Sequence, residues 1–330
     1  MGHPLRDRDL RFAVDPLICG VMDGAFLKDT LPAMPRLRSI HIGFRWKDEH
    51  GLSWDALEAI LSASQLREVT IQTYLVCPRG APARDMPLEN SAQLTTFRHV
   101  RYTSHSELHE NAQRTSLAIV VGSLNLCIER LRLPSDLAPI STLRSRPWPR
   151  LRELRLDGVW PRHLDSPLIY MISEMPGLRT LALETALPCD MERQAVWPHG
   201  SSPHFPFPEL EELVVSFPHP EDQLYSHLPP TLRSLSLRCC PHHCVYVWTP
   251  DTCMCWHSPI SRASELLKIL SSAKLPLLRQ LQLEYIADHG DAALLDTVSD
   301  SFPYLSSLEI HRFRDVDISD VSVVRRSSSC

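Results

Sequence analysis

Apolar residues recur along the chain in a six-residue pattern whose first, fourth and sixth places are leucine or a similar side chain. Alternate residues of a β-strand point to opposite faces, so the fourth and sixth places share one face of a short strand. The first place lies where such a strand begins. The clearest copy is Pro230-Thr-Leu-Arg-Ser-Leu-Ser-Leu237. The pattern therefore predicts a series of short strands, each with one apolar face.

Copies of this pattern are spread over most of the chain. The first and last copies begin at Leu37 and Leu305, which are 268 residues apart. With a degenerate copy at Leu94 and Phe97, this distance corresponds to a period of roughly 30 residues, close to the range of leucine-rich repeats. The other copies begin at Leu66, Ile128, Leu151, Leu178, Leu210, Leu232 and Leu278. A period of this kind predicts a repeat array.

Prolines and helical patterns alternate with the predicted strands. Proline disfavours helix continuation, so a proline two places before the first leucine is expected to mark where a strand begins. Seven copies have it, at Pro35, Pro149, Pro176, Pro208, Pro230, Pro276 and Pro303. Helical spacing predicts helices at 53–62, with Ser53 as N-cap, and at 165–175, 261–272 and 290–301, whereas 99–115 is the least regular part. The fold expected is α/β: an irregular leucine-rich-repeat solenoid (horseshoe) with a parallel concave sheet and outer helices.

The repeat period also predicts the domain organisation. We expect an N-terminal cap at 1–34, one leucine-rich-repeat domain of about ten repeats at 35–314, and a C-terminal tail at 315–330. Proline-rich stretches and the longest gap between copies predict insertions near 77–92, 197–208 and 239–258.

Composition narrows the classes of function. The 330 residues are 43% hydrophobic and carry a net charge of −5, which argues against a nucleic-acid partner. No apolar run reaches membrane-spanning length and no signal-peptide core is present, so we expect no membrane association and a cytoplasmic or nuclear location. No phosphate-binding glycine loop, nucleophile elbow or kinase signature is present. We therefore expect a protein that is not an enzyme and that binds a protein partner or substrate on its concave face.

A repeated Leu-Arg pair supplies the first candidate site. The arginine takes the second place of six copies, at Arg38, Arg67, Arg152, Arg179, Arg233 and Arg279, and glutamates follow at Glu68, Glu153 and Glu212. Stacked strands would align these residues into a stripe beside the concave sheet. The stripe could bind acidic or phosphorylated segments of a partner. Alternatively, it could be a solvated face whose charges pair with each other.

A cluster of cysteines and histidines supplies the second candidate. Cys240, Cys244, Cys253 and His257 are thiol and imidazole groups of the kind that hold tetrahedral zinc. Their spacing matches no common zinc finger, and Cys240 also occupies the place where leucine-rich repeats often have Asn or Cys. Zinc is thus one possibility, and buried reduced cysteines without a cofactor are the favoured alternative.

Several phrases in the second half of the chain resemble a known family. They are Leu228-Pro-Pro-Thr-Leu-Arg-Ser-Leu-Ser-Leu, Trp256-His-Ser-Pro-Ile with Ala263-Ser-Glu-Leu-Leu, Leu275-Pro-Leu-Leu-Arg-Gln-Leu-Gln-Leu-Glu-Tyr, and Ser301-Phe-Pro-Tyr-Leu-Ser-Ser-Leu-Glu-Ile-His-Arg-Phe-Arg. They resemble fungal (basidiomycete-type) F-box proteins with leucine-rich repeats, over roughly residues 31–314 as architecture. In that family, an F-box docks on the adaptor of a cullin ubiquitin ligase and the repeats choose the substrate.

The F-box pattern itself, Leu-Pro-x-Glu followed by spaced Ile and Leu, does not occur before Leu37. The resemblance therefore implies substrate recognition by this chain, and binding of a cullin-ligase adaptor only if an F-box lies outside it. A leucine-rich-repeat scaffold with no ubiquitin link and a zinc-stabilised binding module are the alternatives.

Overall fold

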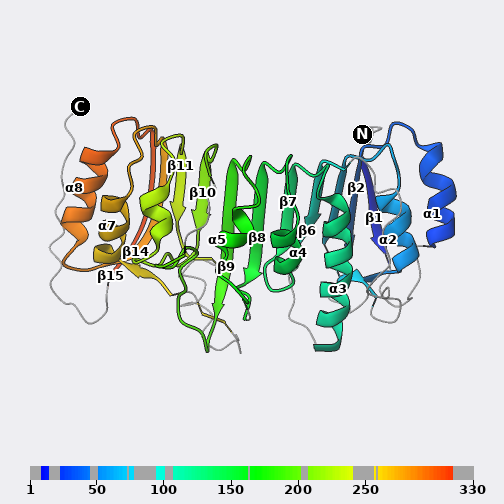
Figure 1. Cartoon of the computed structure of the whole chain (residues 1–330), viewed down its shortest axis with the longest axis horizontal. Coiled ribbons are helices and arrows are strands. Elements are labelled where there is room, and N and C mark those ends of the chain that lie inside the picture. Colours follow the sequence, from blue (N-terminus) through cyan, green and yellow to red (C-terminus); the bar gives the residue numbers. More distant parts are fainter. Residues whose placement is uncertain are drawn as a thin grey trace, which may run out of the picture.

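The computed structural model describes residues 9–14, 23–44, 51–72, 74–77, 94–100, 107–162, 164–201, 207–240, 256–257 and 259–314. These residues form an α/β structure in which a large, open, parallel sheet is accompanied by α-helices (Figure 1). The predicted insertions near 77–92 and 239–258 lie mostly outside the described residues, as does the tail at 315–330. The described part of 197–208 contains neither helix nor strand.

The strands lie side by side in the order in which they occur in the chain, from one end of the molecule to the other (Figure 1). Each of these neighbouring pairs is parallel. In this order the strands are β1 (Asp9–Val14), β2 (Ser39–Phe44), β4 (Glu68–Gln72), β6 (Thr96–His99), β7 (Arg130–Pro134), β8 (Glu153–Val159), β9 (Thr180–Pro188), β10 (Glu212–Val215), β11 (Ser234–Leu237), β14 (Gln280–Ala287) and β15 (Ser307–Arg314).

Four short strands lie beside this series. β3 (Gly51–Leu52) and β5 (Tyr74–Val76) form a separate parallel pair. β12 (Trp256–His257) pairs antiparallel with the end of β9. β13 (Ser261–Arg262) pairs with β14 on the same edge as β11, because β15 occupies the other edge of β14 along its whole length.

The register of the sheet follows the repeat. Residues at the fourth place lie opposite one another from strand to strand: Ile40, Val69, Phe97, Leu131, Leu154, Leu181, Leu213, Leu235, Leu281 and Leu308. The predicted strands are thereby confirmed, including the degenerate copy with Phe97. β1 adds one further strand, which places Leu10 opposite Ile40 and which the sequence pattern did not predict.

Each of the seven predicted prolines is the second residue of a tight turn that leads into a strand. The backbone N–H of Leu37 donates to the carbonyl of Met34 at 3.0 Å, which places Pro35 second in a four-residue turn. Proline favours this position because its ring fixes the backbone angle that the turn requires. The same bond recurs at Leu151, Leu178, Leu210, Leu232, Leu278 and Leu305.

The helices lie between successive strands along the chain. They are α1 (Gly24–Thr30), α2 (Trp54–Leu61), α3 (Glu107–Leu124), α4 (Ile140–Ser145), α5 (Ile169–Ile172), α7 (Ala263–Ser272) and α8 (Asp291–Ser301), with the 3-10 helices η1 (Leu31–Ala33) and η3 (Gln223–His227). Ser53 caps α2 as predicted, because its hydroxyl accepts the N–H of Ala56 at 3.2 Å. The helix predicted at 165–175 is confirmed only as the single turn α5.

The long helix α3 corrects the reading of 99–115 as irregular. Its buried residues Leu117, Val120, Val121 and Leu124 recur at helical spacing and lie just beyond the stretch that showed no pattern. Gln113 is also buried in this helix, where its side chain bonds the backbone of β5 at Leu75 and Val76.

Leucines of the sheet and apolar residues of the helices form one hydrophobic core. From β2 to β14 the fourth-place and sixth-place side chains are buried against the helices, so the alternate positions of these strands face away from them. Leu308, the fourth-place residue of the last strand, β15, is 46% exposed. Within the described residues, no helix combines the length and the apolar character that crossing a bilayer would need.

Candidate functional site

The six predicted arginines lie in one row along the edge where the strands begin. A continuous series of backbone hydrogen bonds connects this level of the repeats: the carbonyl of Arg38 accepts from Arg67, that of Arg152 from Arg179, and that of Arg233 from Arg279. Thr95, Glu129, Glu211 and Ser306 occupy the same level in the other repeats. The structure therefore aligns the arginines at the end of the sheet where the strands begin, and not on either face of the sheet.

Three of these guanidinium groups bind backbone carbonyls of the turns. Arg38 donates to the carbonyls of Pro35 at 2.9 Å and Gln65 at 3.0 Å. Arg67 donates to Ser64 at 3.1 Å, and Arg152 donates to Gly177 at 2.7 Å. These bonds satisfy carbonyls that the turns leave unpaired, so part of the row stabilises the repeat itself.

Arg152 and Arg179 also share a carboxylate. Both lie within 3.4 Å of Glu209, and Arg179 lies 3.7 Å from Glu211. All four side chains are about half exposed. Pairs of this kind contribute little to stability, so these groups can exchange partners at low cost.

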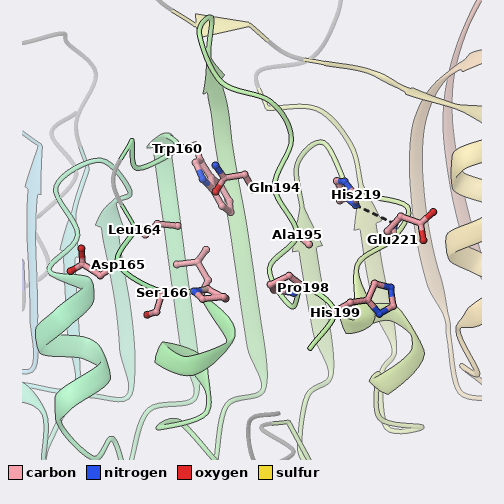
Figure 2. A pocket seen from close by; sticks show the side chains of 12 residues that line it. Trp160, Leu164, Asp165, Ser166, Gln194, Ala195, Pro198, His199, His219 and Glu221 are labelled. Atoms are coloured by element: carbon pink, nitrogen blue, oxygen red, sulfur yellow. Dashed lines mark hydrogen bonds between the residues drawn. The ribbon is translucent and has the colours of Figure 1, made fainter. Parts of the chain in front are cut away.

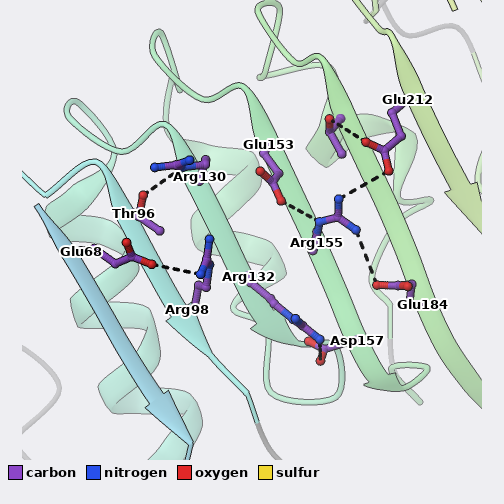
Figure 3. Close-up of polar contacts among 11 residues, drawn as sticks. Glu68, Thr96, Arg98, Arg130, Arg132, Glu153, Arg155, Asp157, Glu184 and Glu212 are labelled. Carbon is purple, nitrogen blue, oxygen red and sulfur yellow. Dashed lines mark hydrogen bonds and ion pairs between the residues drawn. The ribbon is translucent and has the colours of Figure 1, made fainter. Parts of the chain in front are cut away.

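The face of the sheet turned away from the helices carries a second set of charges (Figure 3). Register places Arg98, Arg132 and Arg155 opposite one another on β6, β7 and β8. Arg98 pairs with Glu68 at 3.0 Å, and Arg132 pairs with Asp157 at 3.0 Å. We call the charged residues of this region the charged sheet face: Glu68, Arg98, Arg130, Arg132, Glu153, Arg155, Asp157, Glu184 and Glu212.

Arg155 is the centre of this face. Its guanidinium lies 2.6 Å from Glu153, 3.4 Å from Glu212 and 3.9 Å from Glu184. Burial lowers the pKa of Arg155, but its hydrogen bond to Glu153 and the three carboxylate charges outweigh this effect and raise the pKa above its ordinary value. Three carboxylates around one guanidinium leave this region negatively charged.

Next to Arg155, the carboxyl group of Asp157 is largely withdrawn from water. Burial raises its pKa, the charge and hydrogen bond of Arg132 oppose this shift, and the charge of Glu184 adds to it. The charged sheet face thus runs from a basic part at Arg98, Arg130 and Arg132 to an acidic part at Asp157, Glu184 and Glu212.

Glu68, Glu153 and Glu212 were predicted from the sequence, but their arginine partners were not. All three glutamates lie on the charged sheet face, where they bind Arg98 and Arg155. The missed signal is a second regularity of the repeat, because Arg98, Arg132 and Arg155 all occupy the fifth place. The fifth place lies on the strand itself, whereas the second place precedes it.

Two of the four predicted zinc ligands are described by the structure. Cys240 follows β11 and is half-buried, and His257 lies in β12. Burial, with the charges of Glu184 and Asp157, raises the pKa of Cys240 to about 11. Cys244 and Cys253 lie outside the described residues, and within the described ones no group of three His, Cys, Asp or Glu side chains is placed to hold a metal ion. Zinc binding therefore stays untested, as the less favoured of the two possibilities.

No protein-family model matches this chain, and no curated protein matches it significantly.

Proposed function

We propose that this chain is a protein-interaction module with the architecture of an irregular leucine-rich-repeat solenoid, whose concave sheet face binds a partner. The observation that carries the proposal is the register of the repeats: apolar fourth-place residues face the helices, and charged third-place and fifth-place residues share the opposite face. Side chains on that face can vary without disturbing the core, which suits a repeat array to recognition.

The charged sheet face has the properties of a preformed binding surface. Its groups stand on hydrogen-bonded strands, so a partner need not order them. Side chains of Arg98, Glu184 and Glu212 remain 40%, 36% and 35% exposed, which leaves them accessible. A partner that lays acidic groups over β6 and β7 and basic groups over β9 and β10 would complement this face and be selected over one of the opposite polarity.

The row of arginines along the strand starts borders this face and extends the proposed surface. Arg152, Arg179, Arg233 and Arg279 are exposed there. Some charges of the arginine row and of the charged sheet face already pair with each other, as the alternative interpretation of the sequence expected. A partner would therefore have to replace existing ion pairs.

Resemblance to fungal F-box proteins with leucine-rich repeats favours substrate recognition for a cullin ubiquitin ligase. Under this proposal, the chain supplies the substrate-binding part, and an F-box outside the chain would supply the adaptor contact. A scaffold that binds proteins without any link to ubiquitin would use the same face.

The experiment is quantitative affinity purification of the tagged chain with a charge-removing variant. Glu184→Gln with Glu212→Gln removes two carboxylates of the charged sheet face and leaves Glu153 to hold Arg155. The matched control is Glu58→Gln with Glu110→Gln, which removes two ion-paired carboxylates from α2 and α3 on the helix side. A partner that is depleted at least fivefold by the first variant and retained by the control supports the proposal.

Equal recovery of every partner with both variants would remove the charged sheet face from the proposal. The same purification, repeated with the sequence encoded upstream of Met1, separates the two kinds of interaction protein. A cullin-ligase adaptor recovered only with the upstream sequence supports the substrate receptor, and reproducible partners without any adaptor support the free scaffold.

A further inference from the structure

We propose that a hollow beside α5 binds a short peptide segment that carries a lysine or arginine next to an apolar side chain. The hollow has a volume of about 540 Å³ and is formed by the segments that follow β8, β9 and β10 (Figure 2). This volume is within the range of ordinary ligand sites. The site is separate from the charged sheet face and is tested separately.

Local structure explains why a hollow forms here. Helices α3, α7 and α8 fill the helix side of the sheet at other repeats, but after β8 only the single turn α5 does so. The described residues between β9 and β10 contain no helix, and those between β10 and β11 contain only the 3-10 helix η3. Extended segments cover less of the surface than a helix, which leaves space between α5 and these segments.

A buried carboxylate holds the two walls of the hollow together. Asp222 accepts the N–H groups of Val196 at 2.6 Å and Trp197 at 3.0 Å from one segment, and that of Leu224 at 2.9 Å from its own. The N–H of Gln223 also donates to the carbonyl of Trp197 at 3.0 Å. The hollow is therefore preformed, and a ligand would not have to order it.

Trp160, which lies beside Gln194 in the wall of the hollow (Figure 2), has a hydrogen-bond donor without a partner among the described residues. Trp160 is only 3% exposed, and its indole nitrogen Nε1 has no acceptor among the described residues. Phe217 packs edge-on against this indole at 5.8 Å, and its backbone has a strained positive φ of 39°. An unsatisfied buried donor is costly, so a ligand carbonyl that displaced the exposed Gln194 beside it would gain a favourable bond.

The two histidines of the hollow offer donors of the same kind. The N–H of Glu221 donates to Nδ1 of His219 at 3.1 Å, and the side-chain amide of Gln223 donates to Nδ1 of His199 at 2.7 Å. In each neutral imidazole the proton is then on Nε2, which can donate to a ligand. Three donors spread over one hollow suit the carbonyl groups of a peptide backbone.

Charge and apolar surface define the side chains of that peptide. Asp165 is exposed on the rim and makes no ion pair within the described part of the chain, and no Lys or Arg lines the hollow. Glu221, on the opposite side, is bound by Lys268. Leu164 and Pro198 supply apolar wall between these two ends. A basic side chain would pair with Asp165, and an apolar neighbour would cover Leu164 and Pro198.

The test selects a phage-displayed library of random seven-residue peptides on the immobilised whole chain. We expect enriched peptides to contain Lys or Arg beside a leucine, isoleucine, valine or proline. One enriched peptide, made synthetically, should bind Asp165→Lys at least tenfold more weakly than the unaltered chain. Trp160→Phe keeps an aromatic ring, although a smaller one, and removes the N–H group, so it should weaken binding by roughly threefold to tenfold. The Trp160 indole N–H signal, assigned by its absence in Trp160→Phe, should shift when the peptide is added.

Asp29→Lys on α1 makes the same charge change away from the hollow and should leave peptide binding unchanged. Absence of any enriched sequence, or equal affinity for Asp165→Lys and the unaltered chain, would overturn the proposal. Loss of peptide binding in Glu184→Gln with Glu212→Gln would also overturn it, because the peptide would then occupy the charged sheet face.

Discussion

The guanidinium of Arg152 lies directly over the backbone of Gly177. Its Nη1 donates to the Gly177 carbonyl at 2.7 Å, and a Cβ atom on Gly177 would come within 2.1 Å of that nitrogen. A Cβ atom at residue 177 would therefore force the guanidinium of an arginine from the neighbouring repeat to move and to give up this hydrogen bond. The row of arginines along the strand starts thus connects adjacent repeats through side chains as well as through the backbone.

This contact predicts that Gly177→Ala destabilises the chain only while Arg152 is present. The alanine should displace the guanidinium and cost about 1 kcal/mol, the usual contribution of one hydrogen bond. In an Arg152→Ala background the same substitution should be neutral or slightly stabilising, because alanine restricts the unfolded chain more than glycine does. Urea denaturation of the four chains measures the coupling, and equal costs in both backgrounds would contradict it.

How much of this structure could be predicted from sequence depends on what each residue contacts. The strands and their register follow from the apolar fourth and sixth places, since an alternating pattern can place only one face toward a core. The role of Arg152 could not be derived, because it depends on how close the turn at Gly177 comes in space. The second place precedes the strand, so alternation says nothing about where its side chain points.

The charged sheet face lies between these two cases. The fifth-place residues Arg98, Arg132 and Arg155 could have been found by aligning the copies. Their pairing could not, because Arg155 reaches Glu184 and Glu212 on the next two strands, and only the geometry of the sheet places those strands side by side. The hollow beside α5 depends on segments with no periodic pattern, so no sequence signal indicates it.

Arg155→Met should destabilise the chain through the carboxylates that it leaves behind. Methionine retains much of the packing of arginine but leaves Glu153, Glu184 and Glu212 without the shared cation. We expect a loss of about 1.5–3 kcal/mol in low salt, the range for hydrogen bonds to charged groups. The loss should shrink in 1 M sodium chloride and in the Glu184→Gln with Glu212→Gln background. An equal loss in all three conditions would mean that packing, and not charge, is what Arg155 supplies.

Asp222 gives a prediction with a definite sign. Burial raises its pKa above the ordinary value near 3.8, against the opposing effect of the N–H groups of Leu224, Val196 and Trp197. The folded chain therefore holds this proton more tightly than the unfolded chain does. The corresponding stabilisation is fully present below the unfolded pKa and is lost as pH rises through the folded one.

Asp222→Asn tests this sign. The amide directs N–H groups at backbone N–H groups, so we expect a loss of stability of about 1–3 kcal/mol. The gap in unfolding free energy between the natural chain and the variant should narrow as pH rises from 4 to 7. A gap that widens over this range would show that the N–H groups outweigh burial and that the pKa is lowered.

Asp190→Asn is the matched control for that measurement. A hydrogen bond from Arg162 lowers the pKa of the exposed Asp190. The stabilisation from this carboxylate is present above the unfolded pKa and is lost as pH falls through the folded one. The gap in unfolding free energy between the natural chain and Asp190→Asn should therefore widen as pH rises, in the range below about pH 4. This change has the opposite sign from that expected for Asp222→Asn.

Cys240 should be among the least reactive of the cysteines that the structure describes. With a pKa raised to about 11, chiefly by burial and then by the charges of Glu184 and Asp157, only about one thiol in a thousand is ionised at pH 8. The thiolate is the form that reacts, so iodoacetamide should label Cys240 much more slowly than the exposed Cys189. Glu184→Gln removes the charge that raises the pKa of Cys240 the most and should accelerate labelling of Cys240, whereas Glu58→Gln should not. Peptide mapping by mass spectrometry measures both rates.

The same labelling experiment decides whether Cys240 belongs to a zinc site with Cys244, Cys253 and His257. A zinc-bound thiolate is protected from alkylation by the metal, so a chelator would accelerate labelling and release about one equivalent of zinc. A thiol that is protected only by burial and neighbouring charge would be insensitive to the chelator. We expect insensitivity, with less than about a tenth of an equivalent of zinc in the purified protein, because the thiol pKa already accounts for slow labelling. Chelator-dependent labelling that tracks zinc content would contradict this prediction and would assign the cluster a structural metal.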